Sequence, residues 1–267
     1  MAETEGVLTI RDLCLEFLSN ARAKPVLQGV NLTLREKEVL VLAGESGSGK
    51  SITALSCTAN LPRNAKVTAG SIIYRGQEVL KMREEELRGI RGAQIAYVFQ
   101  EPAAYLNPLF TVGSQIAEAI IQHRSQPFGK ALQIAEALLE QVRIPDPGRV
   151  LSSYPHQLSG GMNQRVFIAM SLALHPKVLI ADEPTTSLDA TAESQILKLF
   201  TDLMQEYHFS LLFITHNLSI AKRIADRVCI MFQGRVVEEG SWQEVSASPR
   251  HFHTRELMEA YEKIGRF

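Results

Sequence analysis

The sequence predicts an α/β protein with a mostly parallel β-sheet, an antiparallel β subdomain and a helical insertion. Three observations predict this fold class. Several short apolar runs are continuous, which is typical of parallel strands covered on both faces, and they alternate along the chain with helical patterns. The N-terminal region instead alternates apolar with polar residues, and prolines gather in the middle third of the chain. A chain of 267 residues, 45% of them hydrophobic, is long enough to bury a large core.

The elements follow in order. Alternation at Leu8–Phe17 and Val26–Leu34 predicts two antiparallel strands with one face in water. Continuous apolar runs predict buried strands at Val39–Ala43, Val178–Ala181, Leu211–Ile214 and Val228–Phe232. The clearest helical patterns cover Lys130–Val142 and Ala190–Tyr207. Six prolines between Pro102 and Pro155 mark turns, so we expect the helical insertion at residues 101–164.

Charge and cysteine usage exclude several classes of protein. With 28 Lys+Arg against 29 Asp+Glu, the chain has no overall basic field for nucleic acid or an anionic membrane, so any anion must be bound locally. The three cysteines, Cys14, Cys57 and Cys229, form no C-x-x-C pair and suggest neither a disulfide framework nor a zinc site. No membrane-spanning stretch or secretory signal is visible, and we expect a cytoplasmic protein.

Residues 44–51 match G-x-x-x-x-G-K-[ST], the phosphate-binding P-loop, between the predicted strand Val39–Ala43 and a helix-compatible stretch. Glycines let backbone N–H groups face phosphate oxygens, Lys50 reaches the β- and γ-phosphates, and the Ser51 hydroxyl binds Mg²⁺. The alternative is a glycine-rich strand-to-helix turn, and the flanks favour the P-loop. The expected contacts with the nucleotide are Gly44, Glu45, Ser46, Gly47, Ser48, Gly49, Lys50, Ser51 and Ile52.

Two adjacent carboxylates, Asp182 and Glu183, end the predicted strand Val178–Ala181. Carboxylates at the end of a buried strand are costly unless cations or polar partners meet them. We expect Asp182 to hold Mg²⁺ and Glu183 to orient or deprotonate an attacking water molecule. The alternative is two solvated carboxylates, and the P-loop upstream favours the magnesium site.

Residues 158–165, Leu-Ser-Gly-Gly-Met-Asn-Gln-Arg, resemble the LSGGQ signature of ABC-type ATPases. Together with the two motifs above, this signature indicates that the chain is similar to that family over most of its length. The resemblance implies that Ser159, Gly160 and Gly161 open a helix that binds the γ-phosphate held by the opposite protomer, so dimerisation completes the site. Taken alone, the segment could be a plain helix N-cap.

The same resemblance assigns roles to isolated residues. Gln100 matches the glutamine that senses the γ-phosphate and Mg²⁺, His216 matches the switch histidine, and Ser187-Leu188-Asp189 matches the D-loop. Phe17 stands where an aromatic ring stacks on adenine. Taken alone, Gln100 could be a turn residue, His216 an ordinary histidine and Phe17 a core residue. Their order along the chain favours the family roles. The expected catalytic residues are Lys50, Gln100, Glu183 and His216, and the expected Mg²⁺ ligands are Ser51, Gln100 and Asp182.

The middle of the chain resembles one branch of the family. Residues 100–113 are similar to the F-Q-[DE]-P-x-x-x-L-N-P-x-x-T-[VI]-G segment of importers for dipeptides, oligopeptides and nickel, and Ser248–Leu257 resembles their S-P-x-H-P-Y-T-x-x-L tail. Residues 160–170 look like the first, D-type, of two non-identical ATPase subunits. The resemblance implies an ATP-hydrolysing subunit that powers an importer for peptides or for nickel and metal chelates, with Gln100–Thr111 as the permease-docking stretch.

The resemblance also implies partners and a domain plan. The partners are a second ABC ATPase subunit, in a heterodimer or a homodimer, two transmembrane permeases and, indirectly, an extracytoplasmic binding protein, with no nucleic acid. The location is the cytoplasmic face of the inner membrane. The expected single ABC ATPase domain, 1–267, has a P-loop NTPase core with the β subdomain at 1–100 and 165–240, a helical subdomain at 101–164 and a helical tail at 241–267.

Two questions stay open from the sequence. A soluble ABC ATPase that is not coupled to a transporter is the alternative function, although such proteins usually carry two ATPase units or a long heptad insertion. The cargo is the other question. No cysteine follows Cys229, so we expect no iron–sulfur cluster, and this short form is similar to the nickel importers. His251 and His253 lack further ligands, so the only metal expected is the Mg²⁺ that accompanies ATP.

Overall fold

A computed structural model describes residues 6–19, 22–186 and 188–264. The chain divides into two compact units. The first contains both ends of the chain, Met1–Leu87 and Ser210–Phe267, and the second is the continuous segment Arg88–Phe209. Ser187, which belongs to the predicted D-loop, lies outside the described residues, as do the first and last few residues of the expected domain and tail.

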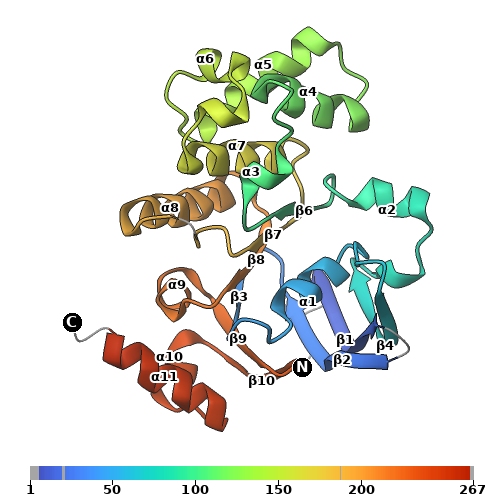
Figure 1. Cartoon of the computed structure of the whole chain (residues 1–267), viewed down its shortest axis with the longest axis vertical. Helices are drawn as coiled ribbons and strands as arrows, with labels where there is room; N and C mark the ends of the chain where they lie inside the picture. The colour runs from blue at the N-terminus through green and yellow to red at the C-terminus, as the bar shows by residue number, and fades with distance from the viewer. Residues whose placement is uncertain (1–5, 20–21, 187, 265–267) are drawn as a thin grey trace. The chain divides into compact units, whose positions relative to one another are not determined.

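Two groups of strands form the first unit (Figure 1). The antiparallel sheet has the order β2-β1-β4-β5, and a second group has the order β10-β9-β3-β8. Strand β3 pairs in parallel with β8 and β9, and β10 pairs antiparallel with β9. The strands are β1 (Leu8–Ser19), β2 (Arg22–Leu34), β3 (Val39–Ala43), β4 (Ala65–Tyr74), β5 (Gln77–Glu78), β8 (Ser210–Thr215), β9 (Arg227–Phe232) and β10 (Arg235–Gly240).

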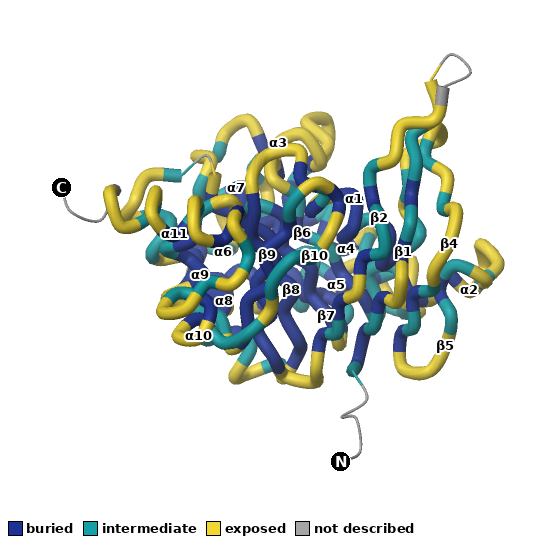
Figure 2. Tube along the Cα trace, turned by 90° about the horizontal axis from the view of Figure 1, so that it is seen from below, coloured by how far each residue is buried: buried dark blue, intermediate teal, exposed yellow. Residues whose placement is uncertain are grey.

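Short helices complete the first unit. They are α1 (Lys50–Ser56), the 3-10 helix η1 (Val79–Lys81), α9 (Leu218–Ile224), α10 (Trp242–Ala247) and α11 (Phe252–Ile264). Helix α2 (Glu84–Ile90) spans the boundary between the units in sequence. Every residue of β3 and β8 is buried, and Figure 2 shows β8 and β9 in dark blue along most of their length. Burial on both faces explains why these strands have continuous apolar sequences.

The second unit is mainly helical. Strands β6 (Ile95–Val98) and β7 (Val178–Asp182) pair in parallel. Helices α4 to α7 lie together (Figure 1), with α5 in contact with α4, α6 and α7. The helices are α3 (Pro102–Tyr105), α4 (Val112–His123), α5 (Phe128–Gln141), α6 (Pro147–Ser152), the 3-10 helix η2 (Pro155–Gln157), α7 (Gly160–Leu172) and α8 (Ala190–Tyr207).

The structure contains all of the strands and both helices that the residue patterns predict. Helix α8 has the predicted bounds, whereas α5 begins at Phe128, directly after Pro127, and ends one residue before Val142. Strand β1 is not regular, because Asp12 has a φ of 47° and its backbone N–H bonds to the side chain of Asn31 at 3.0 Å. This bulge accounts for the break in the alternation of apolar and polar residues between Ile10 and Leu13.

Candidate nucleotide site

The predicted P-loop connects the buried strand β3 to helix α1. Lys50 is buried, and its ammonium group donates hydrogen bonds of 2.8 Å to the carbonyl oxygens of Gly44 and Glu45, which curls the loop around its side chain. The hydroxyl of Ser48 is also buried and has no hydrogen-bond partner among the described residues. A buried cation beside an unsatisfied hydroxyl fits a phosphate group as the missing partner. Ser51 is exposed on the first turn of α1.

Glycine is required where the loop meets strand β9. A side chain at Gly44 would overlap the carbonyl oxygen of Met231, and one at Gly49, where φ is 110°, would lie 2.9 Å from the side chains of Leu27 and Met231. The loop therefore follows its path only because both residues lack a Cβ atom.

His216 directly follows strand β8 and is exposed. Because Thr215 of β8 pairs with Ala43 of β3, His216 and the P-loop leave the sheet at the same edge of the first unit. Asn217 caps helix α9 by accepting a 3.0 Å hydrogen bond from the backbone N–H of Ser219. Phe17 lies near the end of β1, half-buried, between Lys24 of β2 and Ala65 of β4.

In the second unit, parallel pairing brings three of the predicted residues, Gln100, Asp182 and Glu183, to one edge. Val98 of β6 pairs with Ala181 of β7, so Gln100, Asp182 and Glu183 all stand at or just beyond the carboxyl ends of two neighbouring strands. Asp182 is buried, and Gln100 is exposed. This is the edge at which open α/β sheets bind their ligands.

Two side chains that the sequence analysis missed hold these carboxylates. The hydroxyl of Tyr97 donates a 2.8 Å hydrogen bond to Asp182, and the hydroxyl of Thr186 donates one of 2.9 Å to Glu183. Glu183 has a φ of 47°, a left-handed conformation that costs a residue with a side chain about 1 kcal/mol. Such a conformation is concentrated at functional sites. Thr186 follows Glu183 by three residues, and this short spacing is the sequence signal from which their contact could have been predicted.

The remaining predicted residues cap helices. The hydroxyl of Ser159 accepts a 3.3 Å hydrogen bond from the backbone N–H of Met162 at the start of α7, so it acts as the N-cap. Gly160 and Gly161 form the first turn of that helix with open space around them. The carboxylate of Asp189 caps α8 through the backbone N–H groups of Thr191 and Ala192. Ser159, Gly160 and Asp189 are all exposed, so they are accessible to another molecule.

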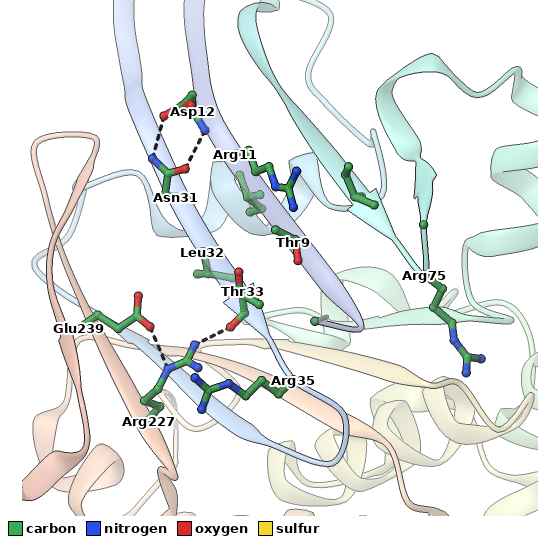
Figure 3. Close-up of a pocket in the computed structure, with 14 residues that line it drawn as sticks. Thr9, Arg11, Asp12, Asn31, Leu32, Thr33, Arg35, Arg75, Arg227 and Glu239 are labelled. Atoms are coloured by element: carbon green, nitrogen blue, oxygen red, sulfur yellow. Dashed lines mark hydrogen bonds and ion pairs between the residues drawn. The ribbon is translucent and has the colours of Figure 1, made fainter. Parts of the chain in front are cut away.

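A cavity of about 690 Å³ in the first unit is not the nucleotide site (Figure 3). Arg227, which lines it, is the first residue of β9 and pairs with Leu40 near the start of β3, so the cavity lies at the opposite edge from the P-loop. Arg227 is paired with Glu38 at 3.2 Å and with Glu239 at 3.0 Å. The carboxylates of Glu38 and Glu239 therefore balance the charge of Arg227.

The buried cysteines are not available as nucleophiles. Burial raises the pKa of the Cys57 thiol to about 12 and raises the pKa of Cys229 well above its ordinary value, so neither is a thiolate nucleophile near neutral pH. Among the residues that the structure describes, no three His, Cys, Asp or Glu side chains gather into a metal site.

A family model described as ABC transporter matches residues 27–186, more than half of the chain. The chain belongs to the ABC transporter family. This ABC protein therefore binds and hydrolyses ATP to drive transport across a membrane, and as a transporter subunit it is membrane-associated. The predictions of the family, the fold and the ATPase activity are confirmed. In the described part of the chain, no helix has both the length and the apolar character needed to cross a bilayer.

Curated relatives cover nearly the whole of this ABC ATPase. It is 43% identical to the oligopeptide transport ATP-binding protein AmiE of Streptococcus pneumoniae, over 98% of this chain and 74% of that protein. It is 45% identical to the probable peptide ABC transporter ATP-binding protein y4tR of Sinorhizobium fredii, over 94% of this chain and 76% of that protein. It is 44% identical to the glutathione import ATP-binding protein GsiA of Salmonella typhi, over 98% of this chain but 43% of that protein.

Solved structures share the fold. The ATP-binding cassette MJ0796, solved as a dimer in a post-hydrolysis state with ADP and phosphate, matches with a TM-score of 0.78 and 27% identity over 88% of this chain and 98% of its own. The protein cbiO1 of Clostridium perfringens, part of the transporter complex cbiONQ, matches with a TM-score of 0.78 and 26% identity over 98% of both chains.

Proposed function

We propose that this ABC ATPase binds ATP with Mg²⁺ at the P-loop and powers the import of peptides. The observation that supports the site best is the phosphate loop itself, in which a buried ammonium group and an unpartnered hydroxyl share one turn of backbone. In this proposal residues 44–52 hold the phosphates, with Lys50 as the cation, and Phe17 stacks on adenine.

The proposed chemistry divides among the residues beyond the strands. Ser51, Gln100 and Asp182 would hold Mg²⁺, which neutralises charge on the transferred phosphoryl group when bound. Glu183 accepts a proton from the attacking water, and Thr186 keeps its carboxylate oriented. His216 contacts the γ-phosphate. Ser159, Gly160, Gly161 and Asp189 serve the site of the opposite protomer.

We propose that two permeases and a second ATPase subunit complete the transporter. Exposed apolar side chains support a docking role for Gln100–Thr111, since Tyr105, Leu109 and Phe110 are 54%, 79% and 53% exposed in one short segment that begins at Gln100. Such a segment can carry a displacement at Gln100 to a bound permease. The dimeric cassette MJ0796 supports pairing with a second ATPase subunit, different from or identical to this chain.

The proposed domain plan follows the sequence analysis: a core with its β subdomain at 1–100 and 165–240, a helical subdomain at 101–164 and a tail at 241–267. The helices α3 to α6 fall inside the proposed helical subdomain, while α7 begins just before its end. The proposed location is the cytoplasmic face of the cell membrane, where ATP is available.

Peptides are the proposed cargo because the names of the relatives AmiE, y4tR and GsiA refer to oligopeptide, peptide and glutathione transport. Deletion of the gene should abolish uptake of labelled di- to pentapeptides and leave uptake of nickel and of metal chelates unchanged. The reverse pattern would overturn the peptide assignment and favour the metal-chelate alternative.

Two variants test the site. Glu183→Gln should bind ATP with unchanged affinity yet hydrolyse it at least about 10²-fold more slowly, the usual scale for a positioned base. Lys50→Ala should instead lose affinity for a fluorescent ATP analogue, because the phosphates lose their cation. Near-normal phosphate release by Glu183→Gln would contradict the catalytic assignment, and normal affinity of Lys50→Ala would contradict the P-loop assignment.

A further inference from the structure

The turn between β9 and β10 is bonded directly to the P-loop. The backbone N–H of Gly234 donates a 2.8 Å hydrogen bond to the carbonyl oxygen of Ser48. The carbonyl oxygen of Gly234 accepts from the backbone N–H of Gln28 at 2.9 Å, and the side-chain amide of Gln28 donates to the carbonyl oxygen of Gln233 at 3.2 Å. The turn is therefore held between strand β2 on one side and the P-loop on the other.

This contact leaves no space for a side chain on the turn. A Cβ atom at Gly234 would overlap the carbonyl oxygen of Val26, and the φ of 77° there is one that side chains rarely adopt. Met231, near the end of β9, likewise leaves no space for a Cβ atom at Gly44 or Gly49. The end of β9 is thus a wall of the P-loop, and its position determines where the loop can lie.

The C-terminal helix is fastened to the same hairpin on both of its strands. The ring of His253 on α11 is buried and stacks on Phe232 of β9, with centroids 4.0 Å apart and planes at 27°. The carboxylate of Glu238 on β10 accepts hydrogen bonds from the backbone N–H groups of Arg250 at 2.8 Å and His251 at 3.0 Å. Only Gln233 separates the stacked Phe232 from Gly234, so α11 is linked to the P-loop by a short path.

We infer that Gly234 and His253 are positioning residues for nucleotide binding: the β9–β10 turn sets the path of the P-loop, and α11 holds that turn in place. The inference rests on the proposed nucleotide site at residues 44–51. Neither residue is required to touch ATP, since each acts through backbone that the P-loop contacts.

The test measures the affinity of each variant chain for a fluorescent ATP analogue, together with KM and kcat. Gly234→Ala should weaken binding by about tenfold, the scale of one lost hydrogen bond plus local displacement, with kcat at saturating ATP within about twofold. Gly76→Ala is the matched control. Gly76 has a similar φ of 81° in a β-turn of the same unit but open space around it, so affinity should not change.

Substitutions at His253 test whether α11 holds the β9–β10 turn in place. His253→Ala should weaken binding by about three- to tenfold, and His253→Phe, which keeps a ring against Phe232, should restore it. Gln28→Ala removes the side-chain bonds to Gln233 and Arg235 without any overlap and should weaken binding by about threefold, which keeps the test valid even if Gly234→Ala does not fold.

The outcomes separate the inference from the site. If Lys50→Ala keeps its affinity, the proposed nucleotide site is wrong. If Lys50→Ala loses affinity while Gly234→Ala, or Gln28→Ala in its place, binds like Gly76→Ala, the inference alone is overturned. Equal weakening by His253→Ala and His253→Phe would show that the ring stack does not connect α11 to the P-loop.

Discussion

The phenol of Tyr97 fixes the direction in which Asp182 presents its carboxylate, because its 2.8 Å hydrogen bond occupies one oxygen of that group. In the absence of the phenol, the carboxylate would rotate more freely and would lose entropy when it binds a cation. Tyr97 is therefore expected to act on cation affinity through Asp182.

Tyr97→Phe should raise the Mg²⁺ concentration for half-maximal ATPase activity by about three- to tenfold, since one charge-assisted hydrogen bond is lost. Binding of the ATP analogue in EDTA should not change. Tyr207→Phe is the control. It removes a hydroxyl group that bonds to Gln141 and not to Asp182, and Tyr207 is the last residue of α8. An unchanged Mg²⁺ requirement in Tyr97→Phe would show that Asp182 needs no such support.

The thiols give a second prediction at this scale. Cys57 and Cys229 are buried with raised pKa values, whereas Cys14 is partly exposed. A thiol-reactive dye at pH 8 should therefore label one cysteine per native chain and three after denaturation, as counted by mass spectrometry. Cys14→Ser should abolish the native labelling, and rapid labelling of that variant would mean that the core opens readily.

Local sequence motifs predicted Lys50, Ser51 and Glu183 because each lies within a few residues of the rest of its motif. Tyr97 could not be predicted in this way. It lies 85 positions from Asp182, and the two meet only because β6 and β7 pair in parallel. A single sequence carries no signal for that meeting, since a tyrosine in a strand has ample structural reasons to be there.

Strands were predictable where burial is complete. Val39–Ala43 and Ser210–Thr215 are buried at every residue, so their apolar runs leave few alternatives. Strands β4 and β10 were missed because most of their residues are exposed or half-exposed and include Lys66, Gly70 and two adjacent glutamates. Pairing with a neighbouring strand, and not their own sequence pattern, makes them strands.

The tail should loosen in acid. Partial burial by itself raises the pKa of Glu238, but hydrogen bonds from the backbone N–H groups of Arg250 and His251, with a smaller contribution from the charge of Arg250, outweigh burial and hold the pKa below its ordinary value. The stabilisation is therefore present above the unfolded value of about 4.3 and is lost as the pH falls through the lower folded value. Below about pH 4, this anchor of α11 should weaken.

Trp242, the one tryptophan of the sequence, reports on this event because it is buried on α10 and meets Tyr261 of α11 edge-on. Its fluorescence should change in acid in the native chain, and in Glu238→Gln the tail should be looser at neutral pH with a smaller acid response. Glu259→Gln, an exposed position on α11, should titrate like the native chain. Coincident curves for all three would mean that Glu238 does not anchor the tail.

Assembly is the prediction for the whole molecule. Because Ser159 would complete the site of a partner, the isolated chain should be mostly monomeric without nucleotide and hydrolyse ATP slowly. ATP should promote pairing of Glu183→Gln, which retains the nucleotide, and not of Lys50→Ala, as followed by light scattering. Full ATPase activity in a strict monomer at every concentration would contradict a site shared between two chains.

The division of the chain also bears on its synthesis. Strand β3 pairs with β8, which the ribosome makes about 170 residues later, a delay of roughly 10–30 s at the usual elongation rate. Until then Val39–Ala43 is an apolar segment with unpaired edges, the kind of segment that chaperones bind and that aggregates when they do not. The nascent first unit thus waits for the last quarter of the chain, whereas the second unit, Arg88–Phe209, is made as one continuous segment.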